Sequence, residues 1–357
     1  MLTGGRRATR VSVSGAAGLT AEGELVATPV PAAVPAGTKA EDLRLALRAA
    51  TMYYLDGLTQ AEIAGRLGVS RPTAGRLVAR AKANGLVRIE IVVPADLRDD
   101  LHAEEERALE ERFGLTEAVV AGHGIDIGAP GRPEAYASVG RAAATLLMRR
   151  LQPGDTLGFT WGPETIAVAR ALSSGVATCR AVVQLDGSMS TAAYQTGSEY
   201  ILARCGEILH ADTYRLPAPL YADPATVASI RNDSGMSRTL AAGARAEVMI
   251  FGIGAVSTST TLFEGSFLDT GMLDELVALG AVGEIGGRFF DAAGVAIASE
   301  LQRRAVSVAL EDIRSCPTSI LVASGVTKHH ATLGALRGGL PRFLVCDIDC
   351  ARWLLSH

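Results

Sequence analysis

The sequence predicts an α/β protein: a small winged helix-turn-helix module followed by a larger Rossmann-like domain with a mostly parallel sheet. Three observations predict this fold class. Two short capped helices joined by a glycine turn occupy residues 59–85, an alternating strand pattern follows at 86–93, and from residue 116 short apolar runs alternate with helical stretches. A chain of 357 residues is long enough for at least two domains.

The first 40 residues are rich in Ala, Gly, Pro, Ser and Thr and have little periodicity, so we expect a disordered tail over 1–40. At Glu41 the pattern changes, and Leu43, Leu47 and Tyr54 follow helical spacing. This pattern predicts a supporting helix in front of the two short ones.

The stretch 59–85 has the signals of a helix-turn-helix. Thr59 and Glu62 have capping-box spacing, Gly68 ends the first helix, and Ser70 caps the second. The stretch from Ser70 to Arg88, both included, contains five basic residues and no acidic one. Helix pairs of this kind also occur as plain packing units, but caps, turn and charge together favour insertion of the second helix into the DNA major groove. We expect base contacts from Arg71, Thr73 and Arg76, and phosphate contacts from Gln60, Ser70 and Arg80.

Residues 86–93 alternate apolar and polar side chains, which predicts a strand that could form a wing, and Pro94 stops it. The DNA-binding module is therefore expected over 41–94. Residues 95–115 read as a charged linker helix whose apolar stripe, formed by Leu97, Leu101 and Leu109, is thin. A solvated linker is the preferred interpretation of this helix, and a dimerisation helix is the alternative.

The net charge of −4 is unevenly distributed. Residues 41–93 carry eight basic and five acidic residues, whereas 94–357 carry twenty-two and thirty-one. DNA contact should therefore be confined to the N-terminal module, and its modest charge predicts an oligomer.

No apolar run approaches a membrane helix, no secretory signal stands at the start, and the five cysteines are dispersed. We expect a cytoplasmic protein without metal or cofactor.

The region 116–357 alternates strands and helices. Strands are expected at 118–121, 156–160, 181–185, 213–216, 248–252, 320–324 and 343–347. Ligands of such sheets bind beyond the C-terminal strand ends, here the loops 161–165, 186–188, 252–254 and 324–328. These loops combine glycine with hydroxyl groups or Lys, which suits an anion or a hydroxylated ligand. No motif for a nucleoside triphosphate or a dinucleotide is present.

Enzymatic activity stays open at this point, because Glu284, Asp291 and Lys328 are candidate acid–base groups. No Ser–His–Asp order or paired-carboxylate signature accompanies them. Another alternative is a DNA-binding scaffold whose body only forms oligomers.

From residue 41 to the end, the chain resembles the SorC-type (SorC/DeoR) sugar-binding transcriptional regulators. The resemblance is carried by YYLDGLTQAEIAGRLGVSRPTAGRLVARAKANGLVRI (53–89), RLPAP (215–219), IFGIG (250–254), LGAVGEIGGRFFDAAG (279–294) and ASGVTKHHATLGALRGG (323–339). It implies a non-enzymatic regulator that resembles sugar-phosphate isomerases and deaminases in fold, forms tetramers, and binds operator DNA and a sugar, polyol or phosphosugar effector. The implied effector contacts, with the adjoining Ser188, are Gly162, Thr165, Gly187, Gly252, Gly254, Glu284, Asp291 and Lys328.

Three positions depart from the family pattern. Glu164 stands where a threonine is expected, and its carboxylate would repel a phosphate, which leaves room for an unphosphorylated sugar or polyol. Gly75 replaces a frequent serine in the second helix, at a cost of about 0.5–1 kcal/mol relative to Ala. Ser324 replaces the first of two usual glycines before Lys328.

Overall fold

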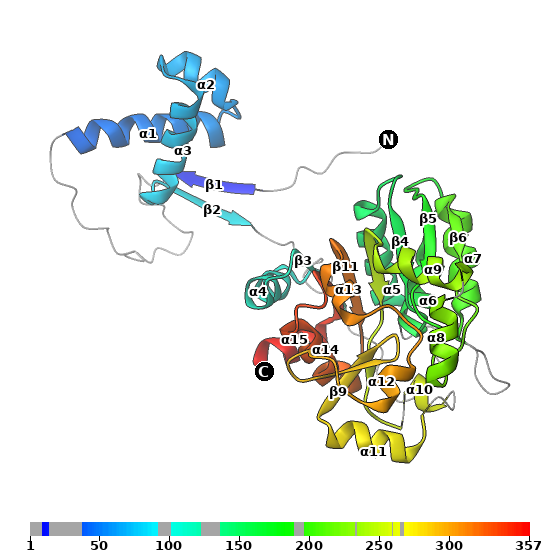
Figure 1. Ribbon diagram of the computed structural model, residues 1–357. Coiled ribbons are helices and arrows are strands. Elements are labelled where there is room, and N and C mark those ends of the chain that lie inside the picture. The colour runs from blue at the N-terminus through cyan, green and yellow to red at the C-terminus, as the bar shows by residue number, and fades with distance from the viewer. Residues whose placement is uncertain are drawn as a thin grey trace. The chain divides into compact units, whose positions relative to one another are not determined.

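The structure is a computed structural model that describes residues 9–13, 38–91, 101–122, 136–188, 196–232, 234–258, 260–264 and 268–357. The chain divides into two compact units, Met1–Ala95 and Asp96–His357. Figure 1 shows both units with their helices and strands.

The first unit contains α1 (Thr38–Tyr54), α2 (Gln60–Leu67), α3 (Arg71–Ala83) and β2 (Val87–Ile91), together with β1, described below. Its core is built from small and branched side chains, with Ala46, Ile63 and Ala74 fully or almost fully buried between the three helices. The predicted supporting helix, helix pair and strand are all present.

The disordered tail expected over residues 1–40 is wrong in two places. Thr9–Val13 forms β1, which pairs antiparallel with β2 from Thr9 opposite Ile91 to Val13 opposite Val87. Thr38 already begins α1. The short alternation TRVSV suits a strand, and β2 supplies the backbone partner that an isolated strand lacks.

The second unit is built on a seven-stranded sheet in which every pairing is parallel. The strand order is β3 (Glu117–Ala121), β12 (Phe343–Asp347), β11 (Thr318–Ala323), β7 (Val248–Phe251), β4 (Thr156–Phe159), β5 (Ala181–Gln184) and β6 (Asp212–Tyr214). The predicted α/β class with a mostly parallel sheet is confirmed.

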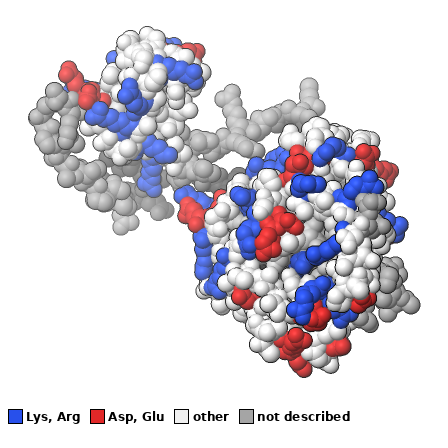
Figure 2. Space-filling view, viewed as in Figure 1, with Lys and Arg blue, Asp and Glu red and all other residues white. Residues whose placement is uncertain are grey.

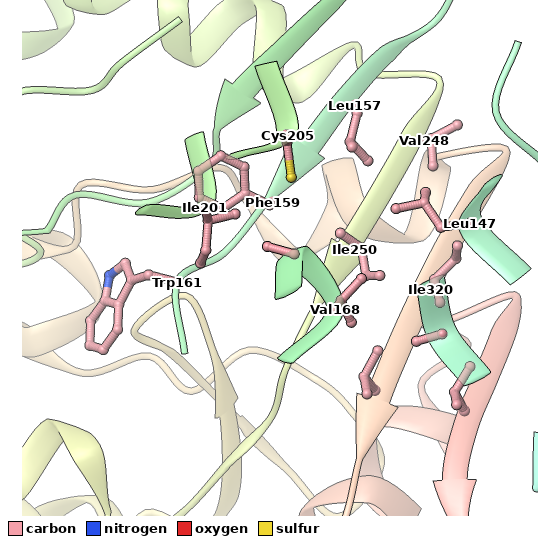
Figure 3. Packing of buried hydrophobic residues seen from close by; sticks show 14 of the residues in the cluster. Leu147, Leu157, Phe159, Trp161, Val168, Ile201, Cys205, Val248, Ile250 and Ile320 are labelled. Atoms are coloured by element: carbon pink, nitrogen blue, oxygen red, sulfur yellow. The ribbon is translucent and has the colours of Figure 1, made fainter. Parts of the chain in front are cut away.

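Both faces of this sheet are covered by helices. Along β7, Val248 and Ile250 join one apolar cluster, while Met249 and Phe251 join the other, as the two-residue period of a strand requires. The first face packs on α5 (Ala137–Arg150), α6 (Pro163–Ala171) and α7 (Ser198–Leu209) (Figure 3). The second packs on α13 (Leu310–Ser315), α14 (His329–Arg337) and α15 (Ile348–Ser356).

A small antiparallel sheet of β8 (Gly254–Ala255), β9 (Ala281–Ile285) and β10 (Arg288–Asp291) was not predicted. Its hairpin turns at Gly286 and Gly287, with φ values of 57° and 77°. A two-residue hairpin turn with positive φ at both positions favours glycine, which explains the glycine-rich run at 279–294.

The remaining helices are α8 (Pro224–Asn232), α9 (Ser234–Ala244), α10 (Thr261–Glu264), α11 (Thr270–Ala278), α12 (Glu300–Arg304) and a 3₁₀ turn at Val326–Lys328.

The charged helix α4 (Ala103–Phe113) is not the solvated linker that was preferred. Its Leu109 is fully buried in the body core. Glu110 accepts a hydrogen bond from the backbone N–H of Ala118 (3.0 Å), and Glu106 accepts one from Val120 (2.9 Å). Carboxylates four residues apart on α4 thus meet N–H groups two residues apart on the edge strand β3. In this way α4 covers that edge of the sheet.

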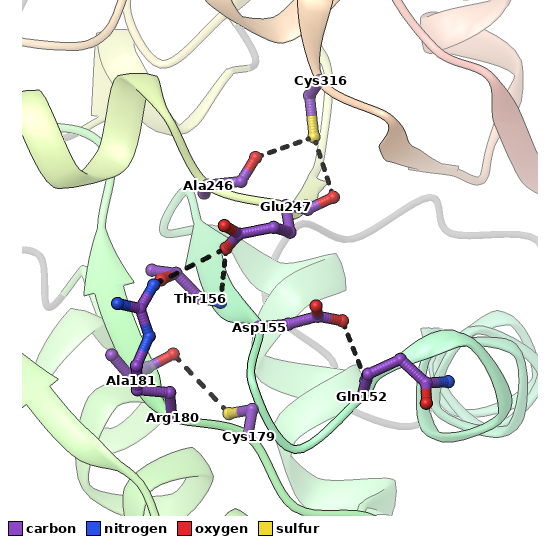
Figure 4. A network of polar contacts seen from close by, with 9 residues as sticks. All are labelled: Gln152, Asp155, Thr156, Cys179, Arg180, Ala181, Ala246, Glu247 and Cys316. Carbon is purple, nitrogen blue, oxygen red and sulfur yellow. Dashed lines mark hydrogen bonds and ion pairs between the residues drawn. The ribbon is translucent and has the colours of Figure 1, made fainter.

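The amino ends of the strands are held by polar contacts (Figure 4). Glu247, before β7, accepts a hydrogen bond from the N–H of Thr156 (2.7 Å), and Arg180 donates to the hydroxyl of Thr156 (2.7 Å). Cys316 donates to the carbonyl of Ala246 (3.3 Å). These bonds tie β4, β7 and β11 together at the end opposite the candidate ligand loops.

In the described parts of the chain, no helix is both long and apolar enough to cross a membrane.

Candidate functional site

The helix-turn-helix is fixed by the caps that its sequence predicts. Thr59 accepts from the N–H of Glu62 (3.3 Å), and the Glu62 carboxylate accepts from the N–H of Thr59 (2.8 Å), which completes a capping box. Gly68 ends α2 with φ 66°. Ser70 caps α3 by accepting from the N–H of Thr73 (3.4 Å). The turn between the helices is therefore determined locally.

Helix α3 has one buried and one basic side. Ala74, Leu77, Val78 and Ala81 are buried, whereas Arg71, Arg76, Arg80 and Lys82 are exposed. Figure 2 shows Lys and Arg side chains grouped over the unit of α1 to α3. An exposed basic face on the second helix of such a pair is what contact with a DNA major groove requires.

The six residues predicted to contact DNA are not equally free. Ser70 shares a hydrogen bond with the hydroxyl of Thr73 (2.8 Å), which in turn accepts one from Arg76 (3.3 Å). Arg80 forms an ion pair with Asp42 of α1 (3.2 Å), although both side chains remain about half exposed. A phosphate would have to compete with this carboxylate for Arg80.

Gln60 lies against α3 rather than fully in solvent. A Cβ at Gly75 would be 3.1 Å from Gln60 Oε1, so the glycine leaves room for the glutamine side chain. Close packing of α2 on α3 is thus a structural reason for the unfavourable glycine in α3.

The candidate effector site lies at the carboxyl ends of β11, β7, β4 and β5. These strands are consecutive neighbours in the sheet, so the loops that follow them lie side by side. All nine candidate residues fall in described parts of the chain. All nine lie in these loops or in the small antiparallel sheet, where Asp291 is the last residue of β10.

An ion pair joins two of these loops. Lys328 Nζ donates to Glu164 Oε1, and the two side chains are only 14% and 2% exposed. The Tyr136 ring also lies near the ammonium, with 5.5 Å from Nζ to the ring centroid. Burial lowers the pKa of Lys328 to about 7, while the adjacent carboxylate favours its charged form. A buried ammonium of this kind favours an anionic partner, which here is the Glu164 carboxylate.

The glycines around Glu164 make room for its carboxylate. A Cβ at Gly252 would be 3.1 Å from Glu164 Oε2, and one at Gly162 would be 3.9 Å away. Thr165 donates its hydroxyl to the carbonyl of Gly162 (3.0 Å), which stiffens the start of α6. Glu164 was noted as a departure but was not among the predicted site residues, and the structure places it against Lys328 and Gly252.

A second buried carboxyl, Glu284, projects from β9. It accepts a hydrogen bond from the N–H of Gly287 (2.7 Å), and burial raises its pKa to about 7. A Cβ at Gly254 would be 2.1 Å from Glu284 Oε1, so the glycine leaves room for this carboxylate. The glycine and the carboxylate were both predicted, and the structure brings them into contact.

Asp186 belongs to the predicted ligand loop 186–188 but was not among the predicted effector contacts. It is 1% exposed, it accepts a hydrogen bond from the N–H of Trp161 (3.3 Å), and burial and then the charge of Glu284 raise its pKa well above its usual value. The sequence feature that could have identified Asp186 is its position as the first acidic residue after the buried run of β5. Asp186 and Glu284 are therefore two neighbouring buried carboxyls that can bind hydroxyl groups.

Gly187 and Ser188 shape the same loop. A Cβ at Gly187 would be 2.3 Å from the carbonyl oxygen of Pro219, so only glycine fits. The Ser188 hydroxyl bonds with Gln184 Nε2 (2.9 Å) and Ser198 Oγ (2.6 Å). These contacts hold the loop after β5 in place.

Asp291 is the predicted residue that the structure does not bring to the others. Its Oδ1 accepts from the N–H groups of Ala293 and Val295, both at 2.9 Å, and so closes the turn after β10. A short carboxylate that serves two local N–H groups in a turn has a structural role. In the described residues, no group of three or more His, Cys, Asp or Glu side chains could hold a metal ion.

Comparison with known proteins agrees with both parts of the chain. The family described as "Putative sugar-binding domain" matches residues 100–356, and "Sigma-70, region 4" matches residues 49–84. The chain is 31% identical over 317 residues to the deoxyribonucleoside regulator of Bacillus subtilis (strain 168), covering 88% of this chain and 98% of that protein. It is 32% identical over 313 residues to the transcriptional regulator LsrR of Escherichia coli (strain K12), covering 86% and 93%.

The fold also has a solved counterpart. The crystal structure of the full-length sorbitol operon regulator SorC from Klebsiella pneumoniae matches with a TM-score of 0.64 and 26% identity, and the match covers 88% of this chain and 99% of that one. The similarity therefore extends over the helix-turn-helix and the body together.

Proposed function

We propose, from the premise that this chain belongs to the SorC-type family of sugar-binding transcriptional regulators, that a sugar, polyol or phosphosugar bound in its body controls how α3 binds operator DNA. The observation that supports the effector site best is the set of buried polar groups at four adjacent strand ends: Glu164 with Lys328, and Asp186 with Glu284. Buried polar groups clustered at this edge of a parallel sheet are typical of a ligand site.

The proposal gives the DNA-facing residues two roles. Arg71, Thr73 and Arg76 contact base edges from the first half of α3, so loss of one should relax specificity at one position and cost about 1–3 kcal/mol. Gln60, Ser70 and Arg80 contact phosphates, so their loss should weaken binding to all sequences alike.

The proposed effector contacts are the loop glycines 162, 187, 252 and 254 together with Thr165, Ser188, Glu284 and Lys328. Asp291 supports the adjacent turn in this proposal. The names of the relatives make sorbitol and deoxyribonucleosides the first compounds to try, and a carbohydrate-catabolism operon the first target. The modest positive charge of the DNA-binding unit supports an oligomer, proposed as a tetramer, because several copies then share one operator.

The decisive experiment measures DNA affinity with and without candidate effectors. Duplexes selected by the protein from a random library would be titrated by fluorescence anisotropy in the presence of sugars, polyols and their phosphates. We expect a change of about 5–150-fold with the right compound, the usual range of allosteric coupling. Absence of any change across the panel would contradict the proposal.

An enzymatic body is the alternative, and the pKa of about 7 at Glu284 is the observation that favours it, because general acid–base groups titrate near neutral pH. The relatives carry the names of regulators. Incubation with sugar phosphates separates the two proposals: turnover abolished by Glu284→Gln supports an enzyme, and a changed DNA response without turnover supports a regulator.

A further inference from the structure

The anion-binding features of the effector site are already occupied by a side chain of the protein. Glu164 is the second residue of the nine-residue helix α6, whose amino terminus has no side-chain cap. Its carboxylate contacts Lys328 and lies close to Gly252. A helix amino terminus, glycine loops and a lysine are the parts that usually hold a phosphate. Here the lysine and the glycine at position 252 lie against the carboxylate of Glu164.

We propose that Glu164 makes this pocket select an effector without a phosphate group, an uncharged sugar or polyol whose hydroxyls bind the Glu164–Lys328 pair. This inference rests on the proposed function, because it specifies the ligand of the same site. A phosphate at Lys328 would have to displace the Glu164 carboxylate or lie beside it, and two buried anions in contact repel strongly. Hydroxyl groups can instead donate to the carboxylate and accept from the ammonium.

The charges nearby support the same conclusion. The described loops at this edge (160–163, 185–188, 252–254, 284–288 and 324–328) contain two basic residues. Lys328 pairs with Glu164, and Arg288 donates to the carbonyls of Val308 (2.6 Å) and Ser307 (2.7 Å). Asp186 and Glu284 add acceptors for hydroxyl groups rather than positive charge. In the described loops the positive charge of Lys328 is thus already balanced by the negative charge of Glu164, and such a site suits a neutral ligand.

The test compares matched ligands on the full-length protein. Isothermal titration would use the probe pairs sorbitol and sorbitol 6-phosphate, ribose and ribose 5-phosphate, and deoxyribose and deoxyribose 5-phosphate, with inorganic phosphate alone as a further probe. For the sugar that binds, we expect the neutral form to bind the wild-type protein at least about tenfold more tightly than its phosphate, because the carboxylate acts against an anion. Tighter binding of the phosphate would overturn the inference while leaving the proposed function intact.

Variants then assign the selectivity to Glu164. Glu164→Gln keeps the side-chain size and leaves Lys328 without its carboxylate, so binding of the phosphorylated form or of inorganic phosphate should improve by about tenfold or more. Glu164→Thr answers the same question if the glutamine variant does not fold, and the exposed Glu275→Gln should leave the preference unchanged. No gain for phosphate in a folded variant would overturn the role of Glu164. If no compound of either kind binds wild type, the proposed function itself fails.

Discussion

Replacing Glu284 by glutamine should change stability in a manner that depends on pH. The carboxyl is buried, and burial raises its pKa from 4.5 to about 7. Between pH 4.5 and about pH 7 the Glu284 carboxyl is ionised in the unfolded chain but keeps its proton in the folded protein. The free energy of unfolding therefore falls as the pH rises through this range. Above pH 7 the group is ionised in both states, and the rise in pKa corresponds to about 3 kcal/mol of destabilisation.

Glutamine has no such titration, and its amide oxygen can still accept the hydrogen bond from Gly287. Glu284→Gln should therefore match wild type at low pH, exceed it slightly at pH 5, and exceed it by about 3 kcal/mol at pH 8.5. This gain would show that the wild-type carboxylate is kept at a cost to stability, as expected of a ligand-binding group.

Urea unfolding of the full chain at several pH values measures this difference. Both tryptophans, Trp161 and Trp353, belong to the second compact unit, so their fluorescence follows the unfolding of the body. Glu275→Gln on the surface of α11 is the matched control and should stay within about 0.5 kcal/mol of wild type at every pH. A difference that is constant with pH, or a Glu284→Gln protein that is less stable at pH 8.5, would refute the reasoning.

Two further predictions concern the DNA-binding unit and the ligand loop. Asp42→Asn releases Arg80 from its ion pair, so affinity for unrelated duplexes at low salt should rise by up to about fivefold; an equal rise in Asp56→Asn would attribute the gain to net charge instead. Gly187→Ala forces the backbone to move, since its new Cβ would lie 2.3 Å from a carbonyl oxygen, and urea unfolding should show a loss of about 1–3 kcal/mol. Gly154→Ala, where nothing lies within 4 Å, should unfold like wild type.

The parts of the fold that depend on neighbours in sequence could be predicted. The helix-turn-helix is an example, because Thr59, Gly68 and Ser70 act on backbone groups within four residues of themselves. The parallel strands were also found, since a strand buried on both faces appears as a short apolar run. For the same reason their order in the sheet stayed open, because a buried run does not identify its neighbours.

Features that join distant residues were missed or misjudged. The partner of Glu164 is 164 residues away, so the sequence could indicate a carboxylate at the loop but not that it pairs with Lys328. The hairpin at Gly286 and Gly287 was not predicted, because glycine gives no strand signal. Asp291 was grouped with the effector contacts, although its short side chain serves the next turn of the chain.

The two outer strands of the parallel sheet differ in a way that matters for assembly. At β3 the glutamates of α4 occupy backbone N–H groups that an incoming strand would need. At the opposite margin β6 is a strand of three exposed residues, Asp212–Tyr214. Within the described residues, an extended peptide or a second subunit that lengthens this sheet by backbone pairing would meet exposed residues at β6. At β3 it would first require the release of α4, and so would any filament grown by pairing at both margins.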